Sequence, residues 1–79
     1  MVITYYAGAA DAAGVGGVEL DAGDLTADEL RRRLGAGNEA LTGVLASCSL
    51  LVDGSPVRDA AAVIPSGARV DVLPPFAGG

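Results

Sequence analysis

The chain has 79 residues, is 51% hydrophobic but only 4% aromatic, and contains no histidine, no lysine and one cysteine. A domain this small has no room for a large active-site cavity, and without imidazole or a second thiol it lacks the usual nucleophile pairs and metal-ligand sets. Ten acidic residues against five arginines give a net charge of -5, which argues against binding to nucleic acids or anionic membranes and suits a basic protein partner.

Two further features of the composition concern the compartment and the missing lysine. No apolar run reaches the length of a membrane span, and the N-terminus lacks a basic region and a cleavage site, so we expect a cytoplasmic protein with a reduced Cys48. The absence of lysine has two interpretations. In the functional interpretation, the chain lacks lysine so that it cannot accept an isopeptide bond on its own side chains. In the other, the composition is simply biased towards Ala, Gly, Val and Arg. We prefer the compositional bias.

The N-terminal segments predict two paired strands. Val2 to Ala7 is a β-branched and aromatic run with large apolar groups on both faces, which is typical of an interior strand. Gly8 to Gly17 is rich in glycine and alanine and predicts a long hairpin loop, and its glycines lack the spacing of a phosphate-binding loop. Val18 to Leu20 then predicts a short strand antiparallel to the first, and Asp21 to Asp24 a connector.

A helix start follows the connector. Thr26 and Glu29 fit a capping box, with Thr26 as the N-cap. Arg31 to Arg33 occupy the last turn, where cations suit the helix dipole and where we expect a solvated helix end. Gly35 ends the helix. One apolar face follows the helical spacing: Ala27, Leu30 and Leu34.

The second half predicts another helix and three strands. Asn38 caps a shorter helix that runs to Ala46, and Cys48 opens the third strand as a buried structural cysteine. Asp53-Gly54 is a strong turn signal before a brief edge strand. The predicted inner face of the helix is Leu41, Val44 and Leu45. The predicted strands are Cys48–Val52, Pro56–Val57 and Ala68–Leu73, with Val70 and Val72 pointing inward in the last.

The order of elements is strand, strand, helix, short helix, strand, short strand, strand. Two strands, a crossover helix and a last strand that pairs with the first describe an α+β fold, the β-grasp or ubiquitin-like roll. We expect a mixed sheet of four to five strands, one main helix and a second short helix. The whole chain, residues 1–79, is predicted to be a single domain, with residues 74–79 as a protruding C-terminal tail.

The tail carries the chemistry that the rest of the chain lacks. Its residues are Pro74, Pro75, Phe76, Ala77, Gly78 and Gly79, and we expect a free main-chain carboxylate on Gly79. The prolines stiffen the exit from the strand, and the glycines make a tip thin enough for a narrow channel. The alternative is a frayed terminus that happens to end in glycine.

A free carboxylate is a poor electrophile at neutral pH. It must first be activated, for instance as an acyl-adenylate made from ATP, and these residues cannot supply that machinery. We therefore expect a partner enzyme that holds the globular body and threads the tip into its site. Pro74, Pro75 and Phe76 would set reach and register, and Gly78 and Gly79 would fit the channel.

Three segments carry a family resemblance. They are Tyr5-Tyr6-Ala7 followed by Asp11-Ala12-Ala13-Gly14, the turn Val52-Asp53-Gly54, and the run from Asp71 to Gly79, which is similar to a strand-Pro-Pro-apolar-Ala-Gly-Gly terminus. Over essentially the whole chain, the sequence resembles the MoaD/ThiS family of sulfur carriers, most closely the small subunit of molybdopterin synthase. Several residues differ from the family pattern. Ala10 stands where many relatives have Arg, and Gly8-Ala9 stand where relatives have bulkier residues. Phe76 stands where the family more often has Val.

The resemblance implies a β-grasp carrier that is not an enzyme on its own. An E1-like partner would use ATP to adenylate Gly79 and convert it to a thiocarboxylate, with no cofactor bound to the carrier. The large subunit of molybdopterin synthase would receive the tail, and the sulfur would pass to a cyclic pterin phosphate. Gly79 would carry the sulfur, Gly78 would supply clearance, and Pro74, Pro75, Phe76 and Ala77 would contact the partner.

Two alternatives stay open. A thiocarboxylate carrier of the same fold could serve another acceptor, in the synthesis of the thiamine thiazole, cysteine, thiolated tRNA or a secondary metabolite. A ubiquitin-like modifier or interaction module would share the fold without the sulfur chemistry.

Overall fold

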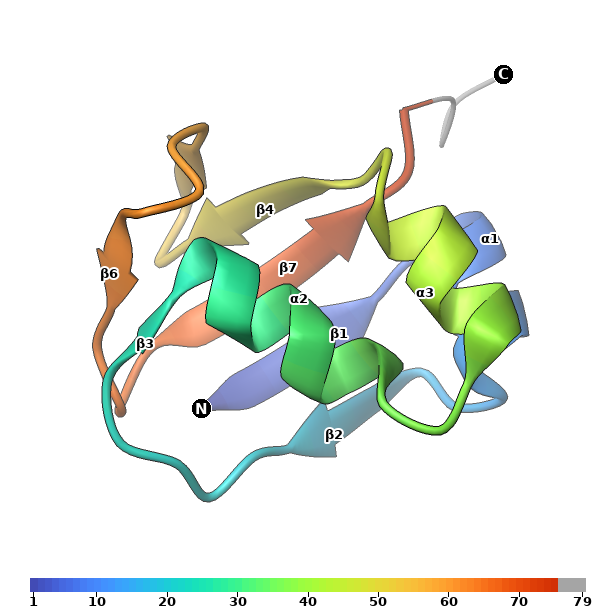
Figure 1. Ribbon diagram of the computed structural model, residues 1–79, viewed down its shortest axis with the longest axis horizontal. Coiled ribbons are helices and arrows are strands. Elements are labelled where there is room, and N and C mark those ends of the chain that lie inside the picture. Colours follow the sequence, from blue (N-terminus) through green and yellow to red (C-terminus); the bar gives the residue numbers. More distant parts are fainter. Residues whose placement is uncertain (76–79) are drawn as a thin grey trace.

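The sheet is built around β7 (Arg69–Leu73), the last strand of the chain (Figure 1). In the computed structural model, which describes residues 1–75, β7 pairs in parallel with β1 (Val2–Tyr5) and antiparallel with β4 (Ser49–Val52). The edge strands β2 (Gly17–Glu19) and β5 (Ser55–Val57) complete a five-stranded mixed sheet in the order β2-β1-β7-β4-β5. The predicted pairing of the first and last strands is confirmed.

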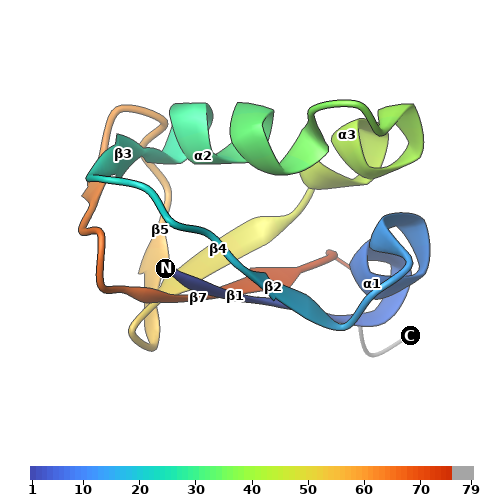
Figure 2. The same ribbon diagram turned by 90° about the horizontal axis from the view of Figure 1, so that it is seen from below.

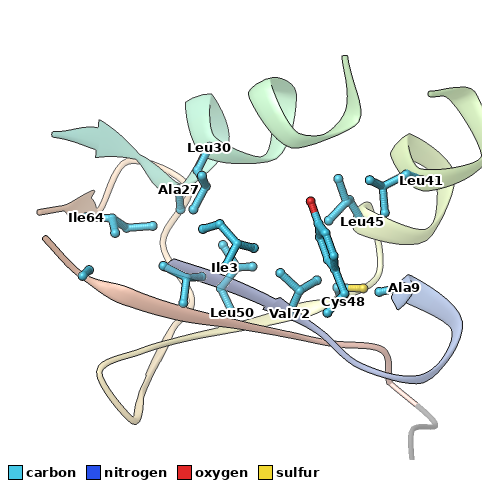
Figure 3. Close-up of a cluster of buried hydrophobic side chains, with 13 residues drawn as sticks. Ile3, Ala9, Ala27, Leu30, Leu41, Leu45, Cys48, Leu50, Ile64 and Val72 are labelled. Atoms are coloured by element: carbon cyan, nitrogen blue, oxygen red, sulfur yellow. The ribbon is translucent and has the colours of Figure 1, made fainter. Parts of the chain in front are cut away.

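One face of this sheet is covered by α2 (Ala27–Gly35) and α3 (Glu39–Leu45) (Figure 2). The strands alternate inward and outward residues, as a sheet with one buried face requires, and the predicted inward positions Val70 and Val72 are fully buried. Helices and sheet enclose an apolar core, much of it visible in Figure 3. Its largest buried side chains are Ile3, Leu30, Leu45, Leu50, Ile64, Val70 and Val72.

Both predicted helices begin as their sequences indicate. The Glu29 N–H donates to Thr26 Oγ1 over 3.1 Å, and the Thr26 N–H donates to Glu29 Oε1 over 2.9 Å, so the capping box is present. At α3 the Leu41 N–H donates to Asn38 Oδ1 over 3.0 Å. Because each cap satisfies backbone donors that a helix leaves free at its start, these sites fix the helix boundaries locally.

The loop predicted from Gly8 to Gly17 is wrong over its first half. Helix α1 (Ala7–Ala13) occupies it, and Gly14, with φ of 77°, ends the helix. No side chain caps α1, and Ala7 enters with φ of 48°, so the usual start signals are absent. Tertiary contacts hold the helix instead: Ala9 is completely buried, and Asn38 Nδ2 donates to the Ala12 carbonyl over 2.9 Å.

A two-stranded sheet was also not predicted. It pairs β3 (Leu25–Thr26) with β6 (Val63–Ile64) in antiparallel register beside the start of α2. Two-residue strands are too short to show a period in the sequence. Ile64 is fully buried and ties this small sheet to the core.

The expected solvated helix end is correct for Arg32 and Arg33 and wrong for Arg31. Arg31 is half-buried, and its Nη1 donates to the Leu45 carbonyl over 2.6 Å and to the Cys48 carbonyl over 2.9 Å. These carbonyls lie at the C-terminal end of α3 and at the connection to β4, where a cation also suits the helix dipole. Arg31 therefore joins α2 to α3.

Among residues 1–75, none of the helices has the length and apolar character that crossing a bilayer requires.

Candidate functional site

The base of the tail is fixed by the two neighbours of β7. Leu73 lies opposite Ser49 of β4, and the carbonyl of Val72 accepts a hydrogen bond from the Tyr6 N–H over 3.2 Å. Pro74, which follows, is half-buried, and Pro75 is exposed. Because proline has no N–H to donate, the strand cannot extend its ladder past Leu73. The chain thus leaves the sheet at a defined point.

The structure describes two of the six predicted site residues. It brings Pro74 and Pro75 to the end of the central strand. Phe76, Ala77, Gly78 and Gly79 lie outside the described residues, so their predicted roles stay predictions.

Beside the base of the tail lies a sheet face that α2 and α3 do not cover (Figure 2). Tyr6, 41% exposed, follows β1 there, and its hydroxyl donates to Asp71 Oδ1 over 3.4 Å. A shallow groove runs along this face. It is lined by Thr4, Tyr6, Asp53, Gly54, Arg69 and Asp71.

Tyr6 and Asp71 were not predicted to form a pair. They are distant in the chain, and the parallel register that sets Tyr5 opposite Val72 brings their side chains together. A signal was available, because Val70 and Val72 were predicted to point inward, and Asp71 between them must then point away from the core. Combining that orientation with parallel pairing of the terminal strands places Asp71 near the end of β1.

The Cys48 thiol and the Tyr5 phenol are both buried. Cys48 is 6% exposed, and burial raises the pKa of its thiol, with Arg31 opposing the shift. Burial also raises the pKa of the Tyr5 phenol. Both groups are therefore protonated at neutral pH. The Cys48 Sγ lies 3.2 Å from the Val44 carbonyl, which confirms the predicted buried structural cysteine.

The sequence of this fold matches the ThiS family over residues 3–79. The chain belongs to the ThiS family. Members of this family are small ubiquitin-like carriers or modifiers, generally not catalytic alone, that work with E1-like activating enzymes. The predicted class of protein is therefore confirmed at the level of the family.

Solved structures show the same fold as this ThiS-family chain. Two crystal structures of small archaeal modifier protein 1 (SAMP1) from Haloferax volcanii are 24% and 21% identical, with TM-scores of 0.80 and 0.81. The alignments cover 100% and 96% of this chain and 98% and 97% of theirs. The solution structure of the HVO 2177 protein of the same organism is 25% identical, with a TM-score of 0.71, covering 99% of this chain and 84% of that one.

These similarities confirm the predicted β-grasp fold. Among curated proteins, none matches the sequence.

Proposed function

We propose that this ThiS-family chain is a cytoplasmic sulfur carrier whose C-terminal Gly79 is adenylated by an E1-like partner and converted to a thiocarboxylate. We further propose that it acts as the small subunit of molybdopterin synthase and gives its sulfur to a cyclic pterin phosphate. The observation that carries the proposal is the position of Pro74-Pro75 directly after the central strand β7, with Phe-Ala-Gly-Gly following them in the sequence.

The chemistry needs no side chain of the carrier. A carboxylate oxygen of Gly79 attacks the α-phosphorus of ATP, and pyrophosphate leaves. Hydrosulfide then attacks the carbonyl carbon, AMP leaves with the electron pair of the broken bond, and loss of the proton gives the thiocarboxylate. Gly79 carries the sulfur, and Gly78 keeps the tip narrow because it has no side chain.

The body supports this chemistry by fixing the point at which the chain leaves the sheet. Pro74 and Pro75 stiffen the exit from the sheet, and Phe76 and Ala77 would contact the partner. The groove with Tyr6 and Asp71 lies beside the base of the tail. It offers an activating enzyme a polar surface to hold while the tip enters its site.

Several molecules other than the cyclic pterin phosphate could accept the sulfur. The Pro-Pro step before the tip favours the molybdopterin role over the thiamine thiazole role, while carriers for cysteine, tRNA thiolation or a secondary metabolite share much of the tail. A second candidate function is covalent modification of other proteins. The similarity in fold to a small archaeal modifier protein favours it.

The first experiment is intact mass spectrometry of the chain after incubation with an E1-like enzyme, ATP and a sulfide source. Replacing one carboxylate oxygen by sulfur adds about 16 Da. We expect this gain on the full chain and not on a variant that lacks Gly79. The truncation should leave the fold intact, because the buried core is formed within residues 1–75. A gain on the truncated variant, or none on the full chain with an enzyme competent on another carrier, would contradict the proposal.

A second experiment separates the acceptors. The thiocarboxylated chain is mixed with a large synthase subunit and the cyclic pterin phosphate. We expect the added mass to disappear as a dithiolene forms. Retention of sulfur there, with transfer to another acceptor, would identify a different pathway. An amide bond to a lysine of another protein would identify a modifier.

A further inference from the structure

A carboxylate activated as an adenylate reacts with whatever nucleophile reaches it first. The lone pair of the nucleophile attacks the carbonyl carbon, the bond to the phosphate oxygen breaks, and AMP leaves with the electron pair while the nucleophile loses its proton. Amines, thiolates and imidazoles are the groups in proteins that do this readily. The surface of the carrier itself is one place where such a nucleophile could lie.

Side-chain amines are missing from that surface. The chain has no lysine and no histidine, and all five of its basic residues are arginines. The guanidinium group stays protonated at any pH at which the protein works, so it has no lone pair to offer. A compositional bias explains how the arginines arose, but the chemical consequence is the same whatever their origin.

The one thiol is out of reach. Cys48 is 6% exposed, and its Sγ lies 3.2 Å from the Val44 carbonyl at the end of α3. The Arg31 side chain closes the same connection by donating to the Cys48 carbonyl. A tail from a second copy of the chain cannot reach this sulfur without local unfolding.

The α-amino group is also engaged. At Met1 it donates to the Leu20 carbonyl over 2.8 Å and to the Ser66 carbonyl over 2.9 Å. These bonds occupy two N–H groups of the amine, and they join the start of β1 to two neighbouring connections. Acylation would have to break both.

We propose that the folded carrier is inert towards its own activated tail, so that the acyl group is kept for a sulfur or amine nucleophile brought by a partner. This inference rests on the proposed activation of Gly79. It also gives a consequence for the competing modifier role. A chain attached to another protein could not receive a second chain on a side-chain amine, so each attachment would be single.

The inertness is tested without any activating enzyme. The folded chain and the chain unfolded in guanidinium chloride are treated with N-hydroxysuccinimidyl acetate and, separately, with iodoacetamide, and intact masses are followed in time. Unfolded, the chain should take one acetyl group on its α-amine and one alkyl group on Cys48, its only amine and only thiol. Folded, both reactions should be at least about tenfold slower, since each group must first give up its contacts.

The matched variant is Arg32→Lys, which keeps the charge at a side chain that is 72% exposed. It should gain one rapid acetyl group in the folded state, which shows that the reagent detects an accessible amine. If the folded wild-type chain reacted as fast as the unfolded chain at either group, the inference would be overturned.

A second measurement uses the activating enzyme and ATP without a sulfide source. Hydroxylamine should release AMP and form the hydroxamate of the full chain, which shows that the tail is activated. No product should appear at twice the chain mass less one water. Such a product from the wild-type chain would overturn the inference, whereas a failure to form the hydroxamate would count against the proposed function alone.

Discussion

Helices α1 and α2 have nearly the same length but are held in different ways. α2 closes its own N-terminus through Thr26 and Glu29, and it carries acidic residues in its first turn and arginines in its last. α1 has no side-chain cap, no acidic residue in its first turn and no basic residue in its last turn, which contains Asp11 instead. Its first residue, Ala7, lies in the left-handed region. Its support comes from the buried Ala9 and from Asn38 at the start of α3.

The difference separates local from tertiary stabilisation. The signals of α2 lie within a few residues of one another, so the segment favours a helix before any packing occurs. The segment of α1 becomes a helix because a small side chain fits against the core. A change that spoils packing should therefore harm α1 most, and a change that spoils capping should act at α2.

The largest effect is expected for Ala9→Glu. It places a carboxylate at a fully buried position with no partner provided, so we expect a loss of more than about 3 kcal/mol in the free energy of unfolding. The matched control is Ala40→Glu on the exposed side of α3, which should change stability by less than about 0.5 kcal/mol. Urea denaturation measures both, and equal effects would show that α1 is not held by this contact.

At α2 the corresponding change is Thr26→Ala. The Glu29 N–H loses its acceptor, and loss of an N-cap costs about 1 kcal/mol. Thr26→Ser keeps a hydroxyl in place and should lose less than half of that. If the serine and alanine variants were equally destabilised in urea, the cap would not be the source of the stability.

A smaller gain is expected within α1 for Gly8→Ala. No atom lies within 4 Å of the added Cβ, and the backbone of Gly8 has no positive φ, so the substitution should stabilise the chain by about 0.5–1 kcal/mol. Gly14→Ala is the contrasting variant, because Gly14 has φ of 77° and should lose about 1 kcal/mol. Thermal unfolding of both variants checks the opposite signs.

The smallest effect concerns the pH dependence of α2. The backbone hydrogen bond from Thr26, then the Thr26 side chain and Arg32, lower the pKa of Glu29 below its ordinary value of 4.5. A pKa lowered by folding gives stability that is present above the unfolded value and lost as pH falls through the folded value. The difference in Tm between wild type and Glu29→Gln should thus shrink as the pH falls below 4.5. A difference that stays constant in that window would count against a charged capping box.

The contrast between the helices also explains which elements of the fold could be predicted from the sequence. The capping box, the Asn38 cap, the Asp53-Gly54 turn and the alternation of Val70 and Val72 are local patterns, and each predicted an element that the structure contains. Helix α1 and the sheet of β3 and β6 depend on contacts with distant segments. The segments of β3 and β6 are too short to show a period. The segment of α1 has a terminating glycine, Gly14, but no side-chain cap that would mark where the helix begins.

The candidate site also contains residues that were predicted from local sequence and residues that were not. Pro74 and Pro75 were predicted from their types and order, and they do end the central strand. The groove with Tyr6 and Asp71 required the register of two strands from opposite ends of the chain. Arg31 was misjudged because its neighbours Arg32 and Arg33 share its chemistry, and only the position of α3 distinguishes it.

The central place of β7 has a consequence for synthesis in the cell. A ribosome makes this strand after all the others, and until it emerges β1 and β4 have no common neighbour and the sheet stays divided. Pairing of segments so distant in the chain is also slow to form. A fragment cut short before β7 would lack both the sheet and the path to the tail. An activating enzyme that grips the body would therefore select for finished chains.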